Sequence, residues 1–446
     1  MTSAERFSEL IRVQTVSSYD PSEEDSTAFD RIPSLLEELY PAAHQAMERE
    51  LVGDRGIVFR WEGTESHLSP ILGMAHYDVV PPGDSEKWQR PPFSGEIVDG
   101  RIYGRGTLDD KGMLAAWMEA AESLASQGKR PHRTVYLAFG GDEETTGQRG
   151  AARIAALFAK RGIRFAYALD EGGAVATNQL KSFVSGPVAL IGAAEKGYLT
   201  LCLRAQGMSG HASAPPKHTA IGRLSTALAA LEAHPFPLAL SEIPQAMLSA
   251  LGRAAGGFKG FLLSHPRLFK PLILSQLGAR SSMASLVRTT LAMTVVRGGE
   301  RDNVLPNEAQ AQINLRILPG ESIASSMARV RNIIHQAVDG DVSVEVVEGS
   351  AFEPVPASPI EGPDWDFLKS AVRQTWPQAV VAPYLMTATT DSRWYRDVCD
   401  AIYRFIPMDV TARESQAVHS EDESISLEAW ERGVSFLTQV LEGQKG

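Results

Sequence analysis

The spacing of hydrophobic residues in the first part of the chain is typical of alternating helices and strands. Residues 3–15 and 113–126 carry apolar side chains on one helical face. Short, mainly apolar runs at 69–75, 134–139 and 165–169 are typical of buried strands. This alternation predicts an α/β domain in which helices flank a mostly parallel sheet.

A different order of elements begins after residue 195. Strand-like and helix-like segments follow one another as β-α-β-β-α-β, the ferredoxin-like order, at 199–205, 220–233, 291–296, 309–317, 327–338 and 342–347. Signals of the α/β type resume at 363–376. We therefore expect a first domain formed by residues 1–195 and 349–446, and an α+β domain, residues 196–348, inserted into it.

Residues 235–288 do not fit this simple scheme. The segment is too long for a plain connection, is rich in Leu and Phe, and is interrupted by Pro266 and Pro271. We predict that it adds short helices to the inserted domain. Its role stays open: it could cover a pocket, form a subunit contact, or do neither.

Composition narrows the class of protein. A chain of 446 residues with 43% hydrophobic and 22% charged residues predicts two or three folded domains. The net charge of −11 disfavours nucleic-acid binding. Two cysteines exclude a disulfide framework and an all-cysteine metal site. Residues 1–9 lack the apolar core of a signal peptide, and we expect no membrane span and a cytoplasmic enzyme.

Polar residues that could carry chemistry follow the predicted strands. His76 and Asp78 come after the first strand, the pair Glu143 and Glu144 after the second, and Asp170 after the third. Ligands in open α/β sheets bind at these carboxyl ends. Each motif taken alone also fits a structural histidine or a solvated acidic loop.

A glycine-rich stretch at 104–112 precedes the helix at 113–126. It resembles a dinucleotide-binding fingerprint, but the third glycine of G-x-G-x-x-G would fall at Asp109, whose carboxylate would repel a pyrophosphate. A nicotinamide-dependent oxidoreductase is therefore disfavoured. The glycines instead favour a tight turn that points Asp109 inward, or a polar turn that caps the helix.

Histidine and carboxylate side chains without cysteine suit zinc or manganese better than copper(I) or an iron–sulfur cluster. A further histidine, His419, lies near the C-terminus. Two histidines and three carboxylates suffice for two metal ions if one carboxylate bridges them.

Taken together, the motifs resemble the co-catalytic metallopeptidases that include aminoacylase, carboxypeptidase S, glutamate carboxypeptidase and succinyl-diaminopimelate desuccinylase. The resemblance covers nearly the whole chain, and the long 235–288 segment is most similar to the carboxypeptidase S branch. The motifs that carry it are 10–17, 76–78, 88–112, 142–144, 170–173, 210–213, 303–306 and His419.

The resemblance implies a role for each residue of the metal site. His76 and Asp170 would bind one divalent ion, Glu144 and His419 the other, and Asp109 would bridge both. The peptide bond after Asp109 would be cis, Glu143 would be the general base, and Asp78 would orient the ring of His76. The ions would be zinc, with manganese or cobalt as alternatives.

The resemblance also implies that the inserted domain acts as a lid and a dimerisation domain. His211 would reach the active site of a partner subunit and stabilise the oxyanion, and Asn303 would contact the substrate. Arg316 would bind the free carboxylate of the substrate. The substrate loop departs from the glycine-rich pattern of relatives, since this chain has Ala-Thr-Thr-Asp-Ser-Arg at 388–393, from which we expect Thr390 to contact the substrate.

We therefore predict a homodimeric two-metal hydrolase that cleaves the amide bond of short peptides or N-acyl amino acids with a free carboxylate. The alternative is a metal-binding scaffold or ligand-binding protein without turnover, which would have no need of a base such as Glu143. The sequence does not indicate the acyl group or the preferred side chain.

Overall fold

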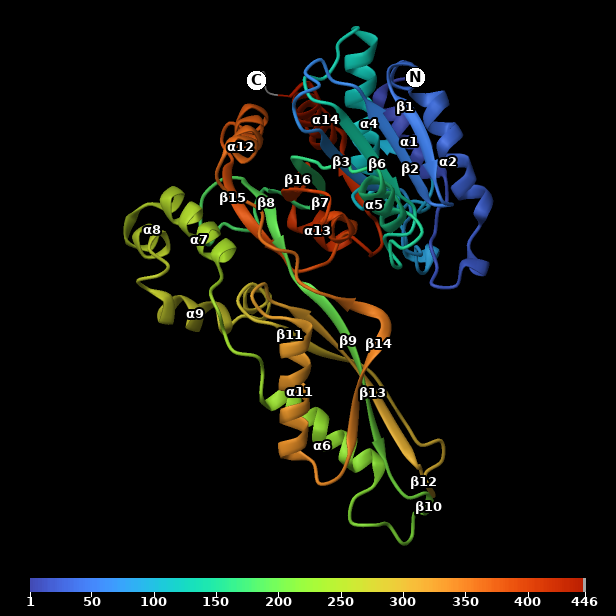
Figure 1. Cartoon of the computed structure of the whole chain (residues 1–446), viewed down its shortest axis with the longest axis vertical. Coiled ribbons are helices and arrows are strands. Elements are labelled where there is room, and N and C mark those ends of the chain that lie inside the picture. The colour runs from blue at the N-terminus through green and yellow to red at the C-terminus, as the bar shows by residue number, and fades with distance from the viewer. Residues whose placement is uncertain (444–446) are drawn as a thin grey trace.

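The computed structural model describes residues 1–443 and shows a broad α/β body with a narrow arm extending from it (Figure 1). The body is built on an eight-stranded sheet with the order β1-β2-β6-β3-β7-β16-β8-β15. Its strands are β1 (Glu48–Val52), β2 (Gly56–Trp61), β3 (Ile71–His76), β6 (Val135–Gly140), β7 (Tyr167–Ala176), β8 (Val188–Glu195), β15 (Val380–Met386) and β16 (Ile402–Val410).

The central strands β6, β3, β7 and β16 run parallel, whereas β1 and β2 pair antiparallel at one edge. Every residue of β3 and β6 is buried, because helices cover both faces of the sheet. The helices of the body are α1 (Ser3–Arg12), α2 (Ser26–Leu39), α3 (Pro41–Ala46), α4 (Lys111–Ser126), α5 (Ala151–Lys160), α12 (Pro363–Thr375), α13 (Ala412–Ala417) and α14 (Leu427–Glu442). The predicted α/β body with a mostly parallel sheet is confirmed.

The two faces of the sheet form separate cores. Side chains that alternate along β6, such as Leu137 and Tyr136, pack into different clusters. Leu137 faces the larger cluster with α1, α4 and α14, and Tyr136 faces the smaller one with α5. Both cores hold the central strands in place, so the loops at their carboxyl ends rest on a rigid base.

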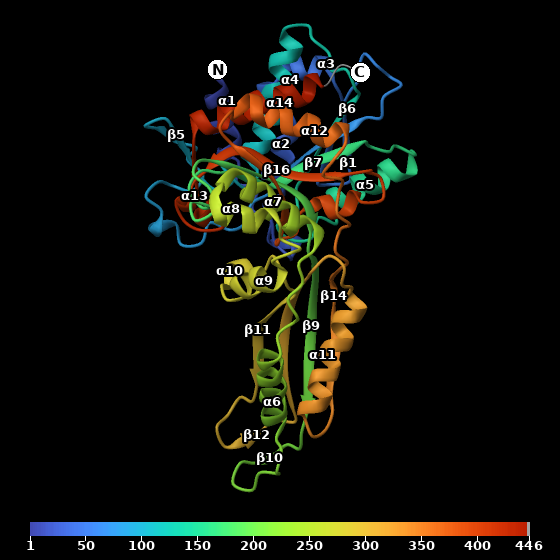
Figure 2. The ribbon, with the colours of Figure 1, turned by 90° about the vertical axis from the view of Figure 1, so that its left-hand side faces the viewer.

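The arm is a four-stranded antiparallel sheet with the order β11-β13-β9-β14 and two helices (Figures 1 and 2). Its elements are β9 (Gly197–Gln206), α6 (Ala220–Ala233), β11 (Thr290–Gly298), β13 (Glu308–Ile317), α11 (Ile323–Ala337) and β14 (Val342–Phe352). The chain order β-α-β-β-α-β and this strand order are those of a ferredoxin-like fold, as predicted.

At the far end of the arm, β10 (Gly210–His211) pairs with β12 (Val304–Leu305) (Figure 2). A small sheet on the body joins β4 (Ile97–Val98), β5 (Arg101–Tyr103) and β17 (Ser424–Ser426). None of the helices described within residues 1–443 is both long and apolar enough to cross a membrane.

The long segment 235–288 differs from the prediction in its placement. It does form short helices, namely α7 (Glu242–Ala255), α8 (Gly257–Ser264), α9 (Lys270–Gly278) and α10 (Ser281–Ala284). However, Met247 and Leu251 of α7 share a core with Ala382 and Leu385 of β15. The segment therefore covers the edge of the large sheet instead of extending the arm, because β15 would otherwise expose an apolar edge strand.

Candidate metal centre

The side chains of the site converge at the carboxyl ends of the parallel strands. His76 is the last residue of β3, and the pair Glu143 and Glu144 follows β6 in a tight turn. Asp109 precedes α4, and His419 lies in the loop between α13 and β17. Parallel neighbours end at the same sheet edge, so residues far apart in the chain meet there.

Asp109 occupies the centre of this group. Its Oδ1 lies 2.9 Å from Nε2 of His76, and its Oδ2 lies 2.9 Å from Nε2 of His419. The Asp109–Asp110 peptide bond is cis, as predicted. One carboxylate thus offers an oxygen to each of two histidines, which is the arrangement a bridging ligand requires.

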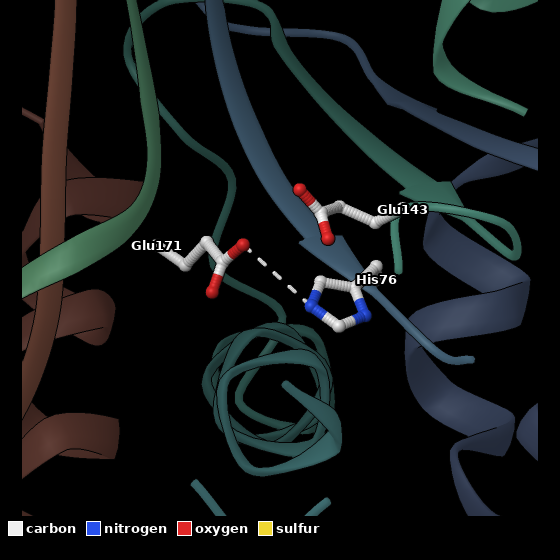
Figure 3. Close-up of side chains that lie close together, drawn as sticks. All are labelled: His76, Glu143 and Glu171. Carbon is white, nitrogen blue, oxygen red and sulfur yellow. Dashed lines mark ion pairs between the residues drawn. The ribbon is translucent and has the colours of Figure 1, made fainter. Parts of the chain in front are cut away.

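Two sets of ligand atoms overlap at His76. Nε2 of His419 is 3.2 Å from Glu144, and ligand atoms of His76, Asp109 and Glu144 lie within 4.8 Å of one another. A second set with the same limit consists of His76, Glu143 and Glu171 (Figure 3). Oε1 of Glu171 is 3.6 Å from Nε2 of His76.

Asp170, the metal ligand implied by the sequence, lies outside the two groups of ligand atoms in this structure. Residues 170–173 lie within β7 and not after it, so neighbouring side chains point to opposite faces of the sheet. The buried Asp170 carboxylate accepts the backbone N–H of Ser392 at 3.0 Å. Glu171 is the carboxylate that lies beside His76, and only the extent of the strand distinguishes these two neighbours.

Asp78 contacts both His76 and the turn that carries Glu143 and Glu144. Its Oδ1 lies 3.4 Å from Nδ1 of His76, and its backbone oxygen is 3.1 Å from the same atom. Its carboxylate also accepts the backbone N–H groups of Glu143 and Glu144, both at 3.1 Å. Asp78 therefore positions the histidine ring so that Nε2 faces the site, and it positions the turn that carries the two glutamates.

Sequence reasoning missed the role of Glu423. This fully buried carboxylate accepts the backbone N–H groups of Gly106, Leu108 and Asp109 and pairs with Arg105 at 2.8 Å. The glycine-rich stretch is therefore a loop wrapped around an anion. The available signal was the acidic run after His419, which the sequence alone could not distinguish from a solvated loop.

The pKa values in the site are shifted because several carboxyl groups are buried close together. Burial raises the pKa of Glu143 and Glu171 well above the usual range, and burial followed by the nearby Asp109 raises the pKa of Glu144 to about 7. Hydrogen bonds to Asp109 and Glu144 raise the pKa of His419 to about 10. Cationic partners stabilise this group of carboxylates.

Asp109 behaves in the opposite way to its neighbours. Burial by itself would raise its pKa, but hydrogen bonds from His419 and His76 outweigh that effect and lower it. Burial likewise opposes protonation of His76, yet the charges of Glu171 and Asp109 raise its pKa well above the ordinary value.

The donor set fits divalent metal ions. Two imidazoles and the carboxylates of Asp109, Glu144 and Glu171 are ligand types that zinc and manganese accept. Four partly buried carboxylates packed together need positive charge, and the histidines supply only two imidazoles. The residues present therefore match a two-ion site with Asp109 between the ions.

Thr390 is buried against Glu195 and does not face the group of metal-ligand side chains. It is 3% exposed, and both its N–H and its hydroxyl donate to Oε2 of Glu195. Glu195 in turn pairs with buried Arg404 at 2.7 Å. Thr390 thus anchors its loop, and the residue of that loop that faces the glutamates is Arg393, 3.9 Å from Glu143.

The residues predicted in the inserted domain are split between two places. Arg316 on β13 stacks over the ring of Tyr198, 4.5 Å from its centroid, and is close enough to Arg393 for their charges to interact. His211 and Asn303 lie together at the far end of the arm, where Ala212 N–H donates to Asn303 O at 3.0 Å. The fold does not bring these two residues to the metal centre of their own chain.

Known proteins resemble the chain over almost its whole length. The model of the family described as peptidase family M20/M25/M40 matches residues 72–443. The N-fatty-acyl-amino acid synthase/hydrolase PM20D1 of Homo sapiens is 34% identical over 440 residues, which cover 97% of this chain and 86% of that protein.

Two further known proteins match the chain over nearly its full length. Carboxypeptidase S of Saccharomyces cerevisiae is 29% identical over 488 residues, covering 99% of this chain and 84% of that protein. The M20 family metallo-carboxypeptidase of Sulfolobus solfataricus has a similar fold, with a TM-score of 0.72, 16% identity and 99% of both chains covered.

Proposed function

The chain belongs to the peptidase family M20/M25/M40 and is a hydrolase, and we propose that it cleaves the amide bond of short peptides or N-acyl amino acids bearing a free carboxylate. The observation that carries this proposal is the position of Asp109, whose two oxygens each meet a different histidine at 2.9 Å.

We assign the metal ligands with one change from the sequence-based set. His76 and Glu171 would hold one ion, Glu144 and His419 would hold the other, and Asp109, which lies between the two histidines, would serve both. We propose zinc, with manganese or cobalt as alternatives. When bound, such a pair of ions polarises the scissile carbonyl and lowers the pKa of a water molecule.

Glu143 is the proposed general base. Its carboxylate lies within 4.8 Å of the ligand atoms of His76 and Glu171, and its backbone is held by Asp78. Burial raises its pKa, so it is a better proton acceptor than an exposed glutamate. Glu143 takes a proton from the attacking water and delivers it to the leaving amine.

Two guanidinium groups are suited to hold the free carboxylate of the substrate. Arg393 lies 3.9 Å from Glu143, and Arg316 comes from the base of the arm. A planar guanidinium can bind a carboxylate with two hydrogen bonds. We assign Arg316 and Arg393 to this role and place Thr390 behind them as the anchor of the loop.

His211 is proposed to serve a neighbouring subunit. Its Nδ1 accepts the backbone N–H of Ser213 at 3.2 Å, which leaves Nε2–H free to donate. Such a donor can stabilise an oxyanion, but His211 lies at the far end of the arm from the metal centre (Figure 1). We therefore propose a homodimer in which His211 and Asn303 complete the site of the partner.

The domain boundaries and the cellular location are also proposed. We divide the chain into a catalytic domain, residues 1–195 and 349–446, and an inserted lid and dimerisation domain, residues 196–348. The last three residues of the catalytic range lie outside the described residues. We also propose a cytoplasmic location, which fractionation of cells that express the tagged protein would test.

The test is a mass-spectrometric screen of a peptide and N-acyl amino acid library with metal-loaded protein. We expect hydrolysis of a subset that shares a free carboxylate. Glu143→Gln should retain both ions and lower kcat by about 10³–10⁴-fold. A metal-loaded protein that cleaves no member of the library would instead favour the scaffold function.

A further inference from the structure

Residues 243–288, which begin just after Glu242 in α7 and end before β11, differ in charge from the rest of the chain. Residues 243–288 contain six of the 43 Lys and Arg residues and none of the 54 Asp and Glu residues, although the whole chain has a net charge of −11. This segment therefore presents a local positive surface on an acidic protein.

Several basic side chains of this segment are exposed, although Lys259 Nζ also lies 5.3 Å from the ring centroid of Phe183 and Arg267 Nε donates to Gln245. Arg253, Lys259, Arg267 and Lys270 are all exposed, and none of the four forms an ion pair with a carboxylate among residues 1–443. Basic residues elsewhere on the surface are often paired, as Arg161 is with Glu50 at 2.7 Å. The positive charge here is thus available to an external anion.

Large apolar side chains lie among these charges. Phe258 of α8 is 79% exposed and Phe261 is 49% exposed, while Leu268 and Leu272 are 69% and 48% exposed. Helices α7 to α10 form one flank of the molecule and face the viewer in Figure 2. We call α8, α9 and the residues between them, 257–278, the helical flank.

The helical flank is firmly attached on its inner side. Leu263, Ile273 and Leu277 are buried in the core that α7 shares with β15 at the edge of the large sheet. The outer side therefore presents Phe258 and Leu268 from a rigid support. Exposed apolar and basic side chains interspersed along one rigidly held segment are the composition of an interaction site.

We propose that the helical flank binds the surface of an anionic lipid bilayer. The exposed phenylalanine and leucine side chains insert at the boundary of head groups and acyl chains, and Lys259, Arg267 and Lys270 contact anionic head groups. A second copy of the chain fits less well, because a symmetric contact through this flank would bring identical positive charges together.

Cosedimentation with vesicles tests this proposal independently of hydrolysis. We expect the full chain to bind phosphatidylcholine vesicles that contain about 30% phosphatidylserine and to bind pure phosphatidylcholine much more weakly. Raising NaCl from about 0.1 to about 1 M should release it, since salt screens exposed charges.

Variants separate the contribution of the apolar side chains to vesicle binding from that of the basic side chains. The double variant Phe258→Ser and Phe261→Ser should weaken partitioning at least about tenfold. Arg267→Glu with Lys270→Glu should weaken it by at least about 25-fold, because loss of each positive charge alone costs about fivefold. Matched controls are Leu51→Ser, a 56% exposed residue of β1, and Lys160→Glu at the end of α5, which should bind as the parent does.

Three outcomes would overturn the proposal. These are equal binding to neutral and anionic vesicles, equal loss of binding in the control variants, and no binding together with a flank-dependent change in sedimentation coefficient. The last result would show that the flank joins two copies of the chain. Circular dichroism of each variant confirms that the compared proteins are folded.

Discussion

The candidate metal centre and the far end of the arm hold the residues assigned to function in contrasting ways. Around Asp109, each side chain has partners in its own chain, and Asp78 and Glu423 hold the loops that present it. At the end of the arm, His211 is exposed and its ring has one hydrogen bond, from the neighbouring Ser213.

The contrast shows that the geometry of one region depends on contacts within the chain, whereas that of the other depends on what the arm meets. The metal centre is built within one chain, because buried carboxylates must be satisfied where they lie. The arm provides a rigid sheet that carries His211 away from the body, so its chemistry depends on what it meets there. Four predictions test the contrast, in order of decreasing effect.

The first prediction concerns the choice between adjacent carboxylates of β7. Glu171→Ala should lose one of two bound ions and nearly all turnover, because it removes a carboxylate beside His76. Metal content per chain, measured by inductively coupled plasma mass spectrometry, checks it.

Asp170→Asn is the matched control. Its side-chain oxygen still accepts the N–H of Ser392, and the loss of metal affinity should stay within about 10–100-fold. If this variant loses its metal while Glu171→Ala retains both ions, the metal centre described here is wrong.

The second prediction tests whether His211 acts across subunits. His211→Ala should lower kcat by about 10²–10³-fold, as expected for loss of an oxyanion donor. Co-expressing it with the Glu143→Gln chain creates mixed dimers that contain one intact site. Random pairing should then restore about a quarter of the parent activity. Activity that stays at the level of the two variants would mean that His211 does not serve a partner.

The third prediction concerns stability. Glu423→Gln leaves the buried Arg105 without its partner and should lower the free energy of unfolding by about 3 kcal/mol or more. Urea denaturation followed by circular dichroism measures this change. Glu421→Gln in the same loop, and His211→Ala on the arm, should each cost less than about 0.5 kcal/mol. Equal losses in all three would remove the contrast between the two regions.

The fourth prediction concerns Lys196, where the body joins the arm. Its Nζ donates to the backbone oxygens of Ser285 and Arg288, and burial followed by the charge of Arg316 lowers its pKa to about 7. Because the unfolded chain binds this proton more tightly, the free energy of unfolding should fall as pH falls from about 10 to about 7. The slope should be at most about 1.4 kcal/mol per pH unit.

Lys196→Met should remove that part of the pH dependence. Urea denaturation of both proteins at several pH values between about 7 and about 10 measures the slope. An unchanged slope in the variant would show that Lys196 is charged in the folded protein throughout this range.

Local patterns in the sequence were enough to determine the architecture. The alternation of apolar strands with helices predicted the body, and the β-α-β-β-α-β order predicted the arm. These patterns succeed because burial of one face imposes a period on the sequence of each element. Polar motifs at the strand ends pointed to His76 and Glu144, and the resemblance to the co-catalytic metallopeptidases implied that Asp109 and His419 join them.

Only the tertiary structure decided matters that depend on register and on distant partners. Glu171 lies beside His76 while Asp170 accepts the N–H of Ser392, because adjacent residues of a strand face opposite sides. The burial of Glu423 and Thr390, and the packing of α7 on β15, arise from contacts between residues far apart in the chain. A sequence motif specifies which groups are present, whereas their neighbours in the fold determine which of them face the site.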